Sequence, residues 1–266
     1  MTEQRWNRGR EVWAAQHDLF RPVEWGVQPI ESDREAGDFV RAHHYSGSFP
    51  AARFRVGLYR KVGFLQSYLA GVAVFSVPVQ PASLLHHVGT MDATELGRLV
   101  LLDEVGFNGE SWFMARAFRL LKKHLPVAGV LSYSDPLPRS TADGRTVTPG
   151  HVGQVYQALN AAYVGRGAAR RLYLDPQGRT VAERGLVKIR KQERGWEPAA
   201  ARLIAAGCAA RNTGEEPTEW LARVLPTLRS VRHPGNHAYV WRFDGVKVPT
   251  GVYPKKTDSG PVVPQD

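Results

Sequence analysis

Cysteine is almost missing from this sequence, since Cys208 is the only one among 266 residues. A single cysteine excludes an intramolecular disulfide framework and any zinc site built from cysteines. Such scarcity is typical of proteins that work in a reducing compartment. We therefore expect a cytoplasmic protein.

Long hydrophobic runs are missing as well. The longest apolar stretch, from Leu69 to Val79, is far shorter than the ~20 residues that a membrane-spanning helix needs. The N-terminal stretch MTEQRWNRGREVWAAQHDLF carries charge throughout, unlike a signal peptide. We expect neither a targeting segment nor a membrane partner. With 43% hydrophobic and 10% aromatic residues and no internal repeat, the chain can bury one substantial core.

Acidic residues are in short supply, because 25 Asp and Glu face 35 Lys and Arg and leave a net charge of +10. The excess is concentrated between residues 164 and 195, which hold three acidic and nine basic residues: Arg166, Arg170, Arg171, Arg179, Arg184, Lys188, Arg190, Lys191 and Arg194. Guanidinium groups suit phosphate, so this basic segment predicts a nucleic-acid surface. The alternative is a solvated basic face without a ligand.

Hydrophobic periodicity predicts a mixed α/β sheet flanked by helices, with an antiparallel first half, a parallel central split and a helical C-terminal extension. Ser32 and Glu35 form a capping box that should start a helix ending near His43. The other predicted helices span 109–124, 150–165, 198–210 and 217–231, and the predicted strands span 53–61, 67–79, 95–102, 127–135 and 237–243. We expect a catalytic core over 1–195, an extension over 196–245 and a flexible tail over 246–266, with 136–150 as a polar loop.

An arginine interrupts the apolar strand at 95–102. If the strand alternates regularly, Arg98 shares a face with Leu96, Val100 and Leu102 and therefore needs an anionic partner. That partner is either a ligand or a neighbouring carboxylate, Glu95 or Asp103.

The turn after this strand opens a helix with Asn108, Gly109, Glu110 and Ser111. Glycine lets the backbone approach a ligand, and free N–H groups at a helix start attract phosphate or pyrophosphate. Asn108 can cap the helix. The alternative is an ordinary capped helix after an ordinary turn.

Polar residues also gather at the end of the strand at 127–135, where Ser132, Ser134 and Asp135 precede a proline. Open α/β sheets place ligands at such strand ends, and Asp135 could orient an amine or act as a base. On the predicted helix that follows, Tyr156 and Asn160 belong to one polar row, and Tyr156 could donate a proton to a leaving group. Each also has a purely structural reading, as a turn residue or as amphipathic core.

Histidine suggests a second type of site. His44 and Tyr45 follow the first predicted helix, and further histidines at 43, 86, 87 and 151 leave a metal site open. No ligand spacing in the sequence supports such a site.

Six stretches in this order, HHYSGS, ELGRLVLLD, FNGES, SYSD, GHVGQVYQALNAAYVGRG and HPGNHAYVWRFD, resemble the Mom family of bacteriophage DNA-adenine modification proteins. That family is a divergent branch of the GNAT acetyltransferase-like fold. The resemblance implies conversion of adenine in DNA to N6-carbamoylmethyladenine, which protects phage DNA from restriction in the host cytoplasm. It also implies acetyl-CoA or a related acyl donor as cofactor, and it associates the family with iron.

The resemblance assigns roles residue by residue. It places Arg98, Ser111, Asp135 and Tyr156 in catalysis. It places Arg98 and residues 108–111 at the cofactor. It places His44 and Tyr45 at the rim of the cleft, on the substrate side. The residue patterns themselves add further substrate-binding candidates, from the predicted helix and the basic segment: Asn160, Arg166, Arg170, Arg171, Lys188 and Arg190.

Three functions therefore compete. A Mom-like DNA-modifying enzyme uses both the cleft residues and the basic segment. An acyl-CoA-dependent N-acyltransferase acting on a small amine or an already modified base needs only the cleft. A non-catalytic DNA-binding protein needs only the charge. A monomer and a homodimer fit all three.

Overall fold

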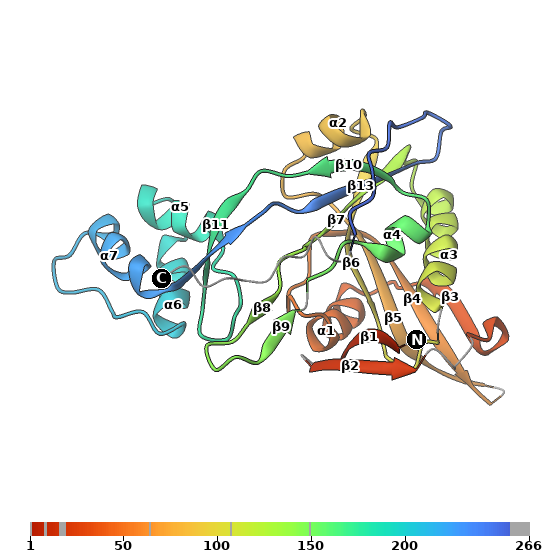
Figure 1. The fold of residues 1–266 in the computed structure, drawn as a ribbon, viewed down its shortest axis with the longest axis horizontal. Coiled ribbons are helices and arrows are strands. Elements are labelled where there is room, and N and C mark those ends of the chain that lie inside the picture. Colours follow the sequence, from red (N-terminus) through yellow and green to blue (C-terminus); the bar gives the residue numbers. More distant parts are fainter. Residues whose placement is uncertain are drawn as a thin grey trace. The chain divides into compact units, whose positions relative to one another are not determined.

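The computed structural model describes residues 2–7, 10–15, 20–63, 65–106, 108–148 and 150–255 (Figure 1). Its contacts divide the chain into two compact units. Unit 1 comprises residues 1–136, 151–167 and 236–259, and unit 2 comprises residues 137–150, 168–235 and 260–266. The end of the predicted flexible tail, from residue 256 onward, lies outside the described residues.

Unit 1 is built on a seven-stranded sheet in the order β10-β13-β7-β6-β5-β4-β3. Its strands are β3 (Trp25–Pro29), β4 (Ala52–Val62), β5 (Gln66–Ser76), β6 (Ala93–Leu101), β7 (Gly129–Ser134), β10 (Ala162–Arg166) and β13 (His237–Arg242). All neighbours pair antiparallel except β6 and β7, which are parallel and are joined through α3 (Gly109–His124). This topology confirms the predicted mixed sheet with its antiparallel first half. A separate antiparallel pair joins β1 (Thr2–Asn7) to β2 (Arg10–Ala15).

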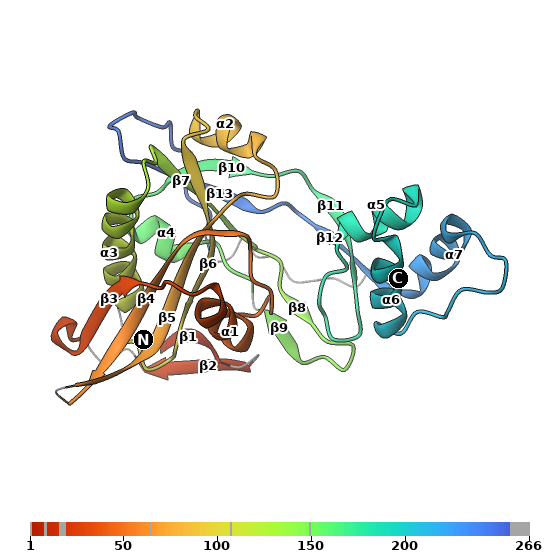
Figure 2. The ribbon, with the colours of Figure 1, turned by 180° about the vertical axis from the view of Figure 1, so that it is seen from behind.

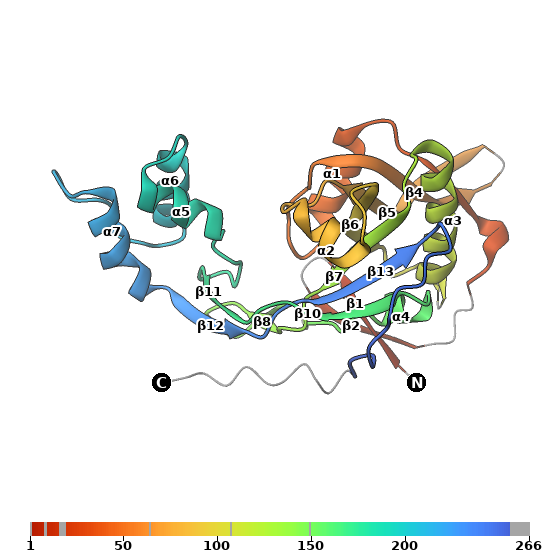
Figure 3. The same cartoon turned by 90° about the horizontal axis from the view of Figure 1, so that it is seen from above.

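Helices cover both faces of this sheet (Figure 3). One face carries α1 (Asp33–His43), packed on Val72, Val74 and Val100, and α2 (Ala82–Val88), packed on Leu131 and Val240. The other face carries α3. The predicted N-cap is confirmed, because the Ser32 side chain accepts hydrogen bonds from the backbone N–H groups of residues 34 and 35. A short 3-10 helix, η1 (Pro22–Glu24), precedes β3.

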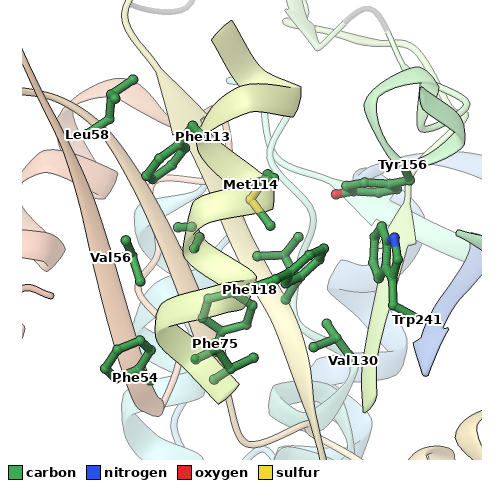
Figure 4. Packing of buried hydrophobic residues seen from close by; sticks show 14 of the residues in the cluster. Phe54, Val56, Leu58, Phe75, Phe113, Met114, Phe118, Val130, Tyr156 and Trp241 are labelled. Atoms are coloured by element: carbon green, nitrogen blue, oxygen red, sulfur yellow. The ribbon is translucent and has the colours of Figure 1, made fainter. Parts of the chain in front are cut away.

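The main core lies between α3 and the sheet (Figure 4). Phe113, Met114 and Phe118 of α3 pack on Phe75 and Val130 of the strands. All five side chains are buried. Burying a side chain of this size stabilises the fold by roughly 1.5–3 kcal/mol, so this layer holds the strand ends around which the candidate site is built.

The helix predicted over 150–165 is wrong. Only α4 (Gln154–Ala158) forms, because Gly153 and Asn160 both adopt positive φ angles, 72° and 55°, which interrupt a helix on either side. The residues that follow become β10 and pair with β13 at the sheet edge. Tyr156 and Asn160 therefore do not share a helix face.

The regular alternation predicted for β6 is also wrong, because the strand contains a β-bulge. Arg98 pairs with Val74 while Leu96 pairs with the next residue of β5, which leaves Gly97 as an extra residue. Leu96 consequently packs in the core beneath α3, whereas Val100 packs beneath α1 on the opposite face. A bulge of this kind re-aims the side chains beyond it. It brings Arg98 onto the face of Glu95.

We expect Gly97→Ala to destabilise this bulge. A Cβ atom at position 97 would lie 2.4 Å from the Ser76 Oγ atom, inside van der Waals contact, and overpacking of this kind costs ~1–3 kcal/mol. Denaturant unfolding should show a smaller loss for Gly97→Ala in a Ser76→Ala background, where the next contact is Pro50 Cγ at 3.3 Å. Equal losses in the two backgrounds would contradict this explanation.

Unit 2 is a small helical cluster with two strand pairs (Figure 2). Its elements are β8 (Arg139–Ser140), β9 (Thr146–Thr148), β11 (Arg170–Leu174), α5 (Glu183–Lys191), α6 (Trp196–Ala205), α7 (Pro217–Val224), η2 (Leu225–Thr227) and β12 (Arg229–His233). The three α-helices bury Leu186, Ile189, Leu203 and Trp220. The helix predicted over 217–231 is too long, because Pro226 falls in η2 and the chain then enters β12.

The predicted boundary at residue 195 lies inside unit 2, between α5 and α6, which pack on each other. The final strand β13 belongs to the sheet of unit 1. Within the residues that the structure describes, no helix has the length and apolar character required to cross a bilayer.

Candidate functional site

The candidate site lies in unit 1, where the two parallel strands separate. The pairing of β6 with β7 ends at Leu96 and Ser132. Both strands continue beyond this point, and β7 stays paired with β13 as far as Ser134. The Ser132 hydroxyl donates a hydrogen bond to the Leu96 carbonyl oxygen at 3.1 Å, at the last paired position of the two strands. The predicted central split is therefore present.

Arg98 is the cationic group of the site. Its Nε and Nη2 atoms donate to the carbonyl oxygen and the Oγ atom of Ser48, at 3.0 and 2.7 Å, and its Nη1 atom donates to the Gly97 carbonyl oxygen. These acceptors are neutral, and within the described part of the chain Arg98 has no ion pair with a carboxylate. A guanidinium has five N–H groups, so donors remain for an anionic ligand.

His44 and Tyr45 follow α1 and belong to the same cluster. Their rings stack with centroids 4.3 Å apart. The backbone N–H of Ser46 donates to the Nδ1 atom of His44 at 3.1 Å, which leaves the proton of the neutral ring on Nε2. Burial, the charge of Arg98 and the proximity of His151 lower the pKa of His44 to about 3. The His44 ring is thus a neutral N–H donor at physiological pH.

Tyr156 reaches the site from the α4 side. Its ring is buried beside Trp241, with ring centroids 5.5 Å apart (Figure 4). The ring of Tyr239 lies 5.4 Å away, between centroids. Burial raises the pKa of Tyr156 to about 12, while a hydrogen bond with Ser132 and the charge of Arg98 act in the opposite direction. The hydroxyl is therefore protonated at physiological pH and available as a proton donor.

Asp135 lies just beyond the end of β7 and is linked to His151. The backbone N–H of His151 donates to the Asp135 carbonyl oxygen at 2.8 Å. Burial lowers the pKa of the His151 ring, and the charge of Asp135 partly offsets this effect. The His151 ring also meets Tyr156 edge-on, at 6.4 Å between centroids. Asp135, His151 and Tyr156 thus form one side of the cluster.

Glu95 is a member of the cluster that the sequence suggested only as a possible ion-pair partner of Arg98. Its carboxylate is half-buried and makes no hydrogen bond or ion pair among the described residues. Burial raises the pKa of Glu95, and the charge of Arg98 lowers it. The bulge at Gly97 puts Glu95 on the face of Arg98, whereas regular alternation would have placed the two side chains on opposite faces. His151 was noted only as a possible metal ligand, and Ser48 was not noted.

The structure thus brings together five residues predicted from the sequence: His44, Tyr45, Arg98, Asp135 and Tyr156. The resulting site combines a cation without a carboxylate ion pair among the described residues, a neutral His44 ring, a protonated phenol and two carboxylates. Groups whose environments drive their pKa values apart are suited to acid and base roles in one reaction.

The low pKa of His44 makes stability depend on pH. A neutral His44 in the folded state protonates near pH 6.5 once unfolded, so stability is lost as the pH falls below that value, by up to ~1.4 kcal/mol per pH unit. We expect His44→Gln to flatten this acid-side decline in denaturant titrations between pH 6.5 and 4. The exposed His86 provides the matched control. If His86→Gln flattens the decline as much as His44→Gln does, burial of His44 is not its cause.

The start of α3 differs from the prediction. Asn108 adopts φ 68° at the N-cap position, and its side chain makes no capping hydrogen bond. A Cβ atom at Gly109 would lie 2.3 Å from Val105 Cγ1 and 3.0 Å from Phe20 Cδ2, so protein side chains occupy the space beside this glycine. The Ser111 hydroxyl donates to the Asn108 carbonyl oxygen at 3.1 Å. The residues present fit an anionic donor at Arg98 and do not form a glycine cradle at Gly109.

The remaining predicted residues lie elsewhere. Asn160 is exposed and borders a shallow hollow of about 250 Å³ that Val240 and Trp241 also line. Arg166 donates from Nη2 to the Nε2 atom of the buried His237 at 3.2 Å. Glu110 is half-buried on α3. Four predicted substrate residues belong to unit 2: Arg170 and Arg171 on β11, and Lys188 and Arg190 on α5.

No group of three or more His, Cys, Asp or Glu side chains among the described residues is arranged to hold a metal ion. His86 and His87 lie on α2, where the His87 ring contacts Tyr133 at 6.1 Å between centroids. The residues described therefore do not fit the iron that the resemblance implied.

Comparison with known proteins identifies the family. The tandem GNAT protein from the clavulanic acid biosynthesis pathway, solved without acetyl-CoA, aligns with 85% of this chain and 100% of its own, at 11% identity and a TM-score of 0.39. No curated protein sequence matches the chain. The Mom protein family matches residues 24–215, which include the whole candidate site. Because this match spans most of the chain, the chain belongs to the Mom protein family.

Proposed function

We propose that this protein modifies DNA by converting adenine to N6-carbamoylmethyladenine, which protects phage DNA from restriction in the host cytoplasm. Family membership supports DNA modification as the function. The observation that carries the proposal is the cluster at the strand split, where Arg98 has no carboxylate ion pair among the described residues and lies near carboxylates, the neutral His44 ring and a protonated tyrosine.

Each group has a role in this proposal. Arg98 holds an anionic part of the group donor through its remaining N–H groups. Asp135 accepts a hydrogen bond from the adenine N6 amine and raises its nucleophilicity. Tyr156 donates a proton to the leaving group. The N6 amine is paired within the duplex, so the target base must be flipped or single-stranded, with Tyr45 as a stacking partner.

The donor in this proposal is a compound that carries a carbamoylmethyl group on a leaving group, because acyl transfer from acetyl-CoA would give N6-acetyladenine, which lacks the amide nitrogen. At the split, the N6 amine would bond to the methylene carbon of this group while the bond from that carbon to the leaving group breaks. Asp135 would take the N6 proton and Tyr156 would protonate the leaving group. Arg98 is the residue of the described chain best suited to the anionic portion of the donor. Neither the turn at Gly109 nor an iron site enters the proposed chemistry, because the residues there do not fit.

Nuclease protection tests this function. Plasmid DNA from cells that express the protein should resist restriction nucleases whose recognition sites contain adenine. The same DNA should remain sensitive to nucleases whose sites contain only guanine and cytosine. Equal sensitivity to both groups of nucleases, with the protein expressed and folded, would contradict adenine modification.

The second candidate is an acyl-CoA-dependent N-acyltransferase that acts on a small amine or an already modified base. The location of the cluster favours it, because every member belongs to unit 1 and no residue of β11 or α5 takes part. A purely DNA-binding protein is disfavoured, since it would not need this cluster.

A further inference from the structure

The strands β11 and β12 form an antiparallel ribbon (Figure 2). Its register places two arginines directly opposite each other. Arg171 pairs with Arg232, and the neighbouring Arg170 pairs with His233. Like charges opposite each other weaken a strand pair. Folding alone therefore gives no reason for this pairing.

Several other arginines of unit 2 are compensated. Arg145 pairs with Asp143, Arg179 with Asp175, Arg184 with Glu193 and Arg223 with Glu215, and Arg229 donates to the carbonyl oxygens of residues 140 and 141. The side chains of Arg170, Arg171 and Arg232 make no ion pair or hydrogen bond with any part of the chain that the structure describes. The side chains of Arg190, Arg194 and Arg202 also lack such partners among the described residues, but only the ribbon places two uncompensated arginines directly opposite each other.

The ribbon is also anchored so that this pair stays exposed. Leu174 and His233 are buried, and Tyr173 packs against the cluster of α5, α6 and α7. Arg171 and Arg232 are exposed. A strand pair fixed at Tyr173 and Leu174 presents two guanidinium groups at a defined spacing, which lowers the entropy cost of binding.

We infer that the ribbon β11–β12 binds the phosphate backbone of duplex DNA through Arg171 and Arg232, which as cross-strand partners share one face of the ribbon. Arg232 lies outside the basic stretch that the sequence suggested, and only the strand pairing brings it opposite Arg171. The inference rests on the proposed function in its choice of DNA as the polyanion. Such contacts position a protein on DNA without reading bases.

Binding to a short duplex of arbitrary sequence, measured over a series of salt concentrations with the full chain, tests the inference. Affinity for DNA falls as salt rises, and each phosphate contact adds about 0.9 to the steepness of log affinity against log salt. Arg171→Ala with Arg232→Ala should therefore make this dependence shallower by about two. The loss should be equal for unrelated duplexes. Arg171→Lys with Arg232→Lys keeps both charges and should keep most of the slope.

Two controls separate this surface from folding and from general charge. Arg202→Ala removes an exposed arginine of α6 in the same unit and should leave the slope unchanged. Relief of the repulsion should leave the melting temperature of the alanine double variant equal to or above that of the wild type. An unchanged slope in this folded variant, or an equal effect of Arg202→Ala, would overturn the inference.

The outcome is independent of the modification reaction. If the wild-type protein binds DNA through the ribbon but leaves adenine unmodified, the proposed function is wrong and the inference about the ribbon stands. If the protein modifies DNA, and the salt dependence of DNA binding is the same in the wild type and in the double variant, the proposed function stands and the inference about the ribbon is wrong.

Discussion

Arg98→Ala should reduce the yield of modified adenine by about a hundredfold or more. Removal of one preorganised donor to a developing or bound negative charge typically costs 10²–10³ in rate. Arg98 supplies the cationic group of the site and bonds only to neutral oxygens within the described residues. Arg98→Lys should recover part of the activity, since a lysine keeps the charge and loses the planar fork. The measurement is the fraction of modified deoxyadenosine in plasmid DNA.

A matched control separates this role from charge and packing. Arg53 lies on β4 in the same unit and donates to the Ala93 carbonyl oxygen at 2.8 Å, so Arg53→Ala removes an equal charge and a similar hydrogen bond. Its activity should stay near that of the wild type. The Arg98 charge also lowers the pKa of His44, which should therefore titrate higher in Arg98→Ala, as NMR can record. Wild-type yield in the folded Arg98→Ala protein would remove Arg98 from the site.

Tyr156→Phe should lower activity by about 10²–10⁴, the range expected for a positioned proton donor. Its pKa of about 12 keeps the hydroxyl protonated where the reaction needs it. The fold should survive, because Ser132 retains its hydrogen bond to the Leu96 carbonyl oxygen. The measurement is again the modified fraction, alongside the melting temperature.

Tyr239→Phe is the control for Tyr156→Phe. The two rings are neighbours, but the Tyr239 hydroxyl donates to the Val152 carbonyl oxygen. Its loss should cost stability, about 1 kcal/mol for one hydrogen bond, and leave the chemistry intact. Full activity of Tyr156→Phe, or equal losses in both variants, would mean that Tyr156 is a structural residue.

Much of the fold follows from local sequence signals. The capping serine at residue 32, the apolar stripe of α3 and the alternating strands β4, β5 and β13 act within single elements. The helix predicted over 150–165 failed because positive φ angles at Gly153 and Asn160 outweigh its periodicity, and pairing of β10 with β13 outweighs helix propensity. The secondary structure of residues 162–166 therefore depends on their pairing with β13, which is distant in the sequence.

The candidate site was predictable in part for the same reason. Arg98, Asp135 and Tyr156 stand out because each breaks an apolar pattern or ends a strand. Glu95 was predictable only as a sequence neighbour of Arg98, since its place on the same face depends on the one extra residue at Gly97. Arg232 depends likewise on the pairing of β12 with a strand far away in the sequence. Neither a β-bulge nor the register of two distant strands can be recognised from hydrophobic periodicity in the sequence.

Mass spectrometry of nucleosides tests the central claim most directly. DNA from cells that express the wild-type protein is digested to nucleosides and compared with DNA from cells that express Arg98→Ala. We predict a deoxyadenosine derivative heavier by one carbamoylmethyl group, with the added mass on the base fragment, in the wild-type sample and nearly absent from the variant. Unmodified deoxyadenosine in the wild-type sample, with the folded protein present, would contradict the account.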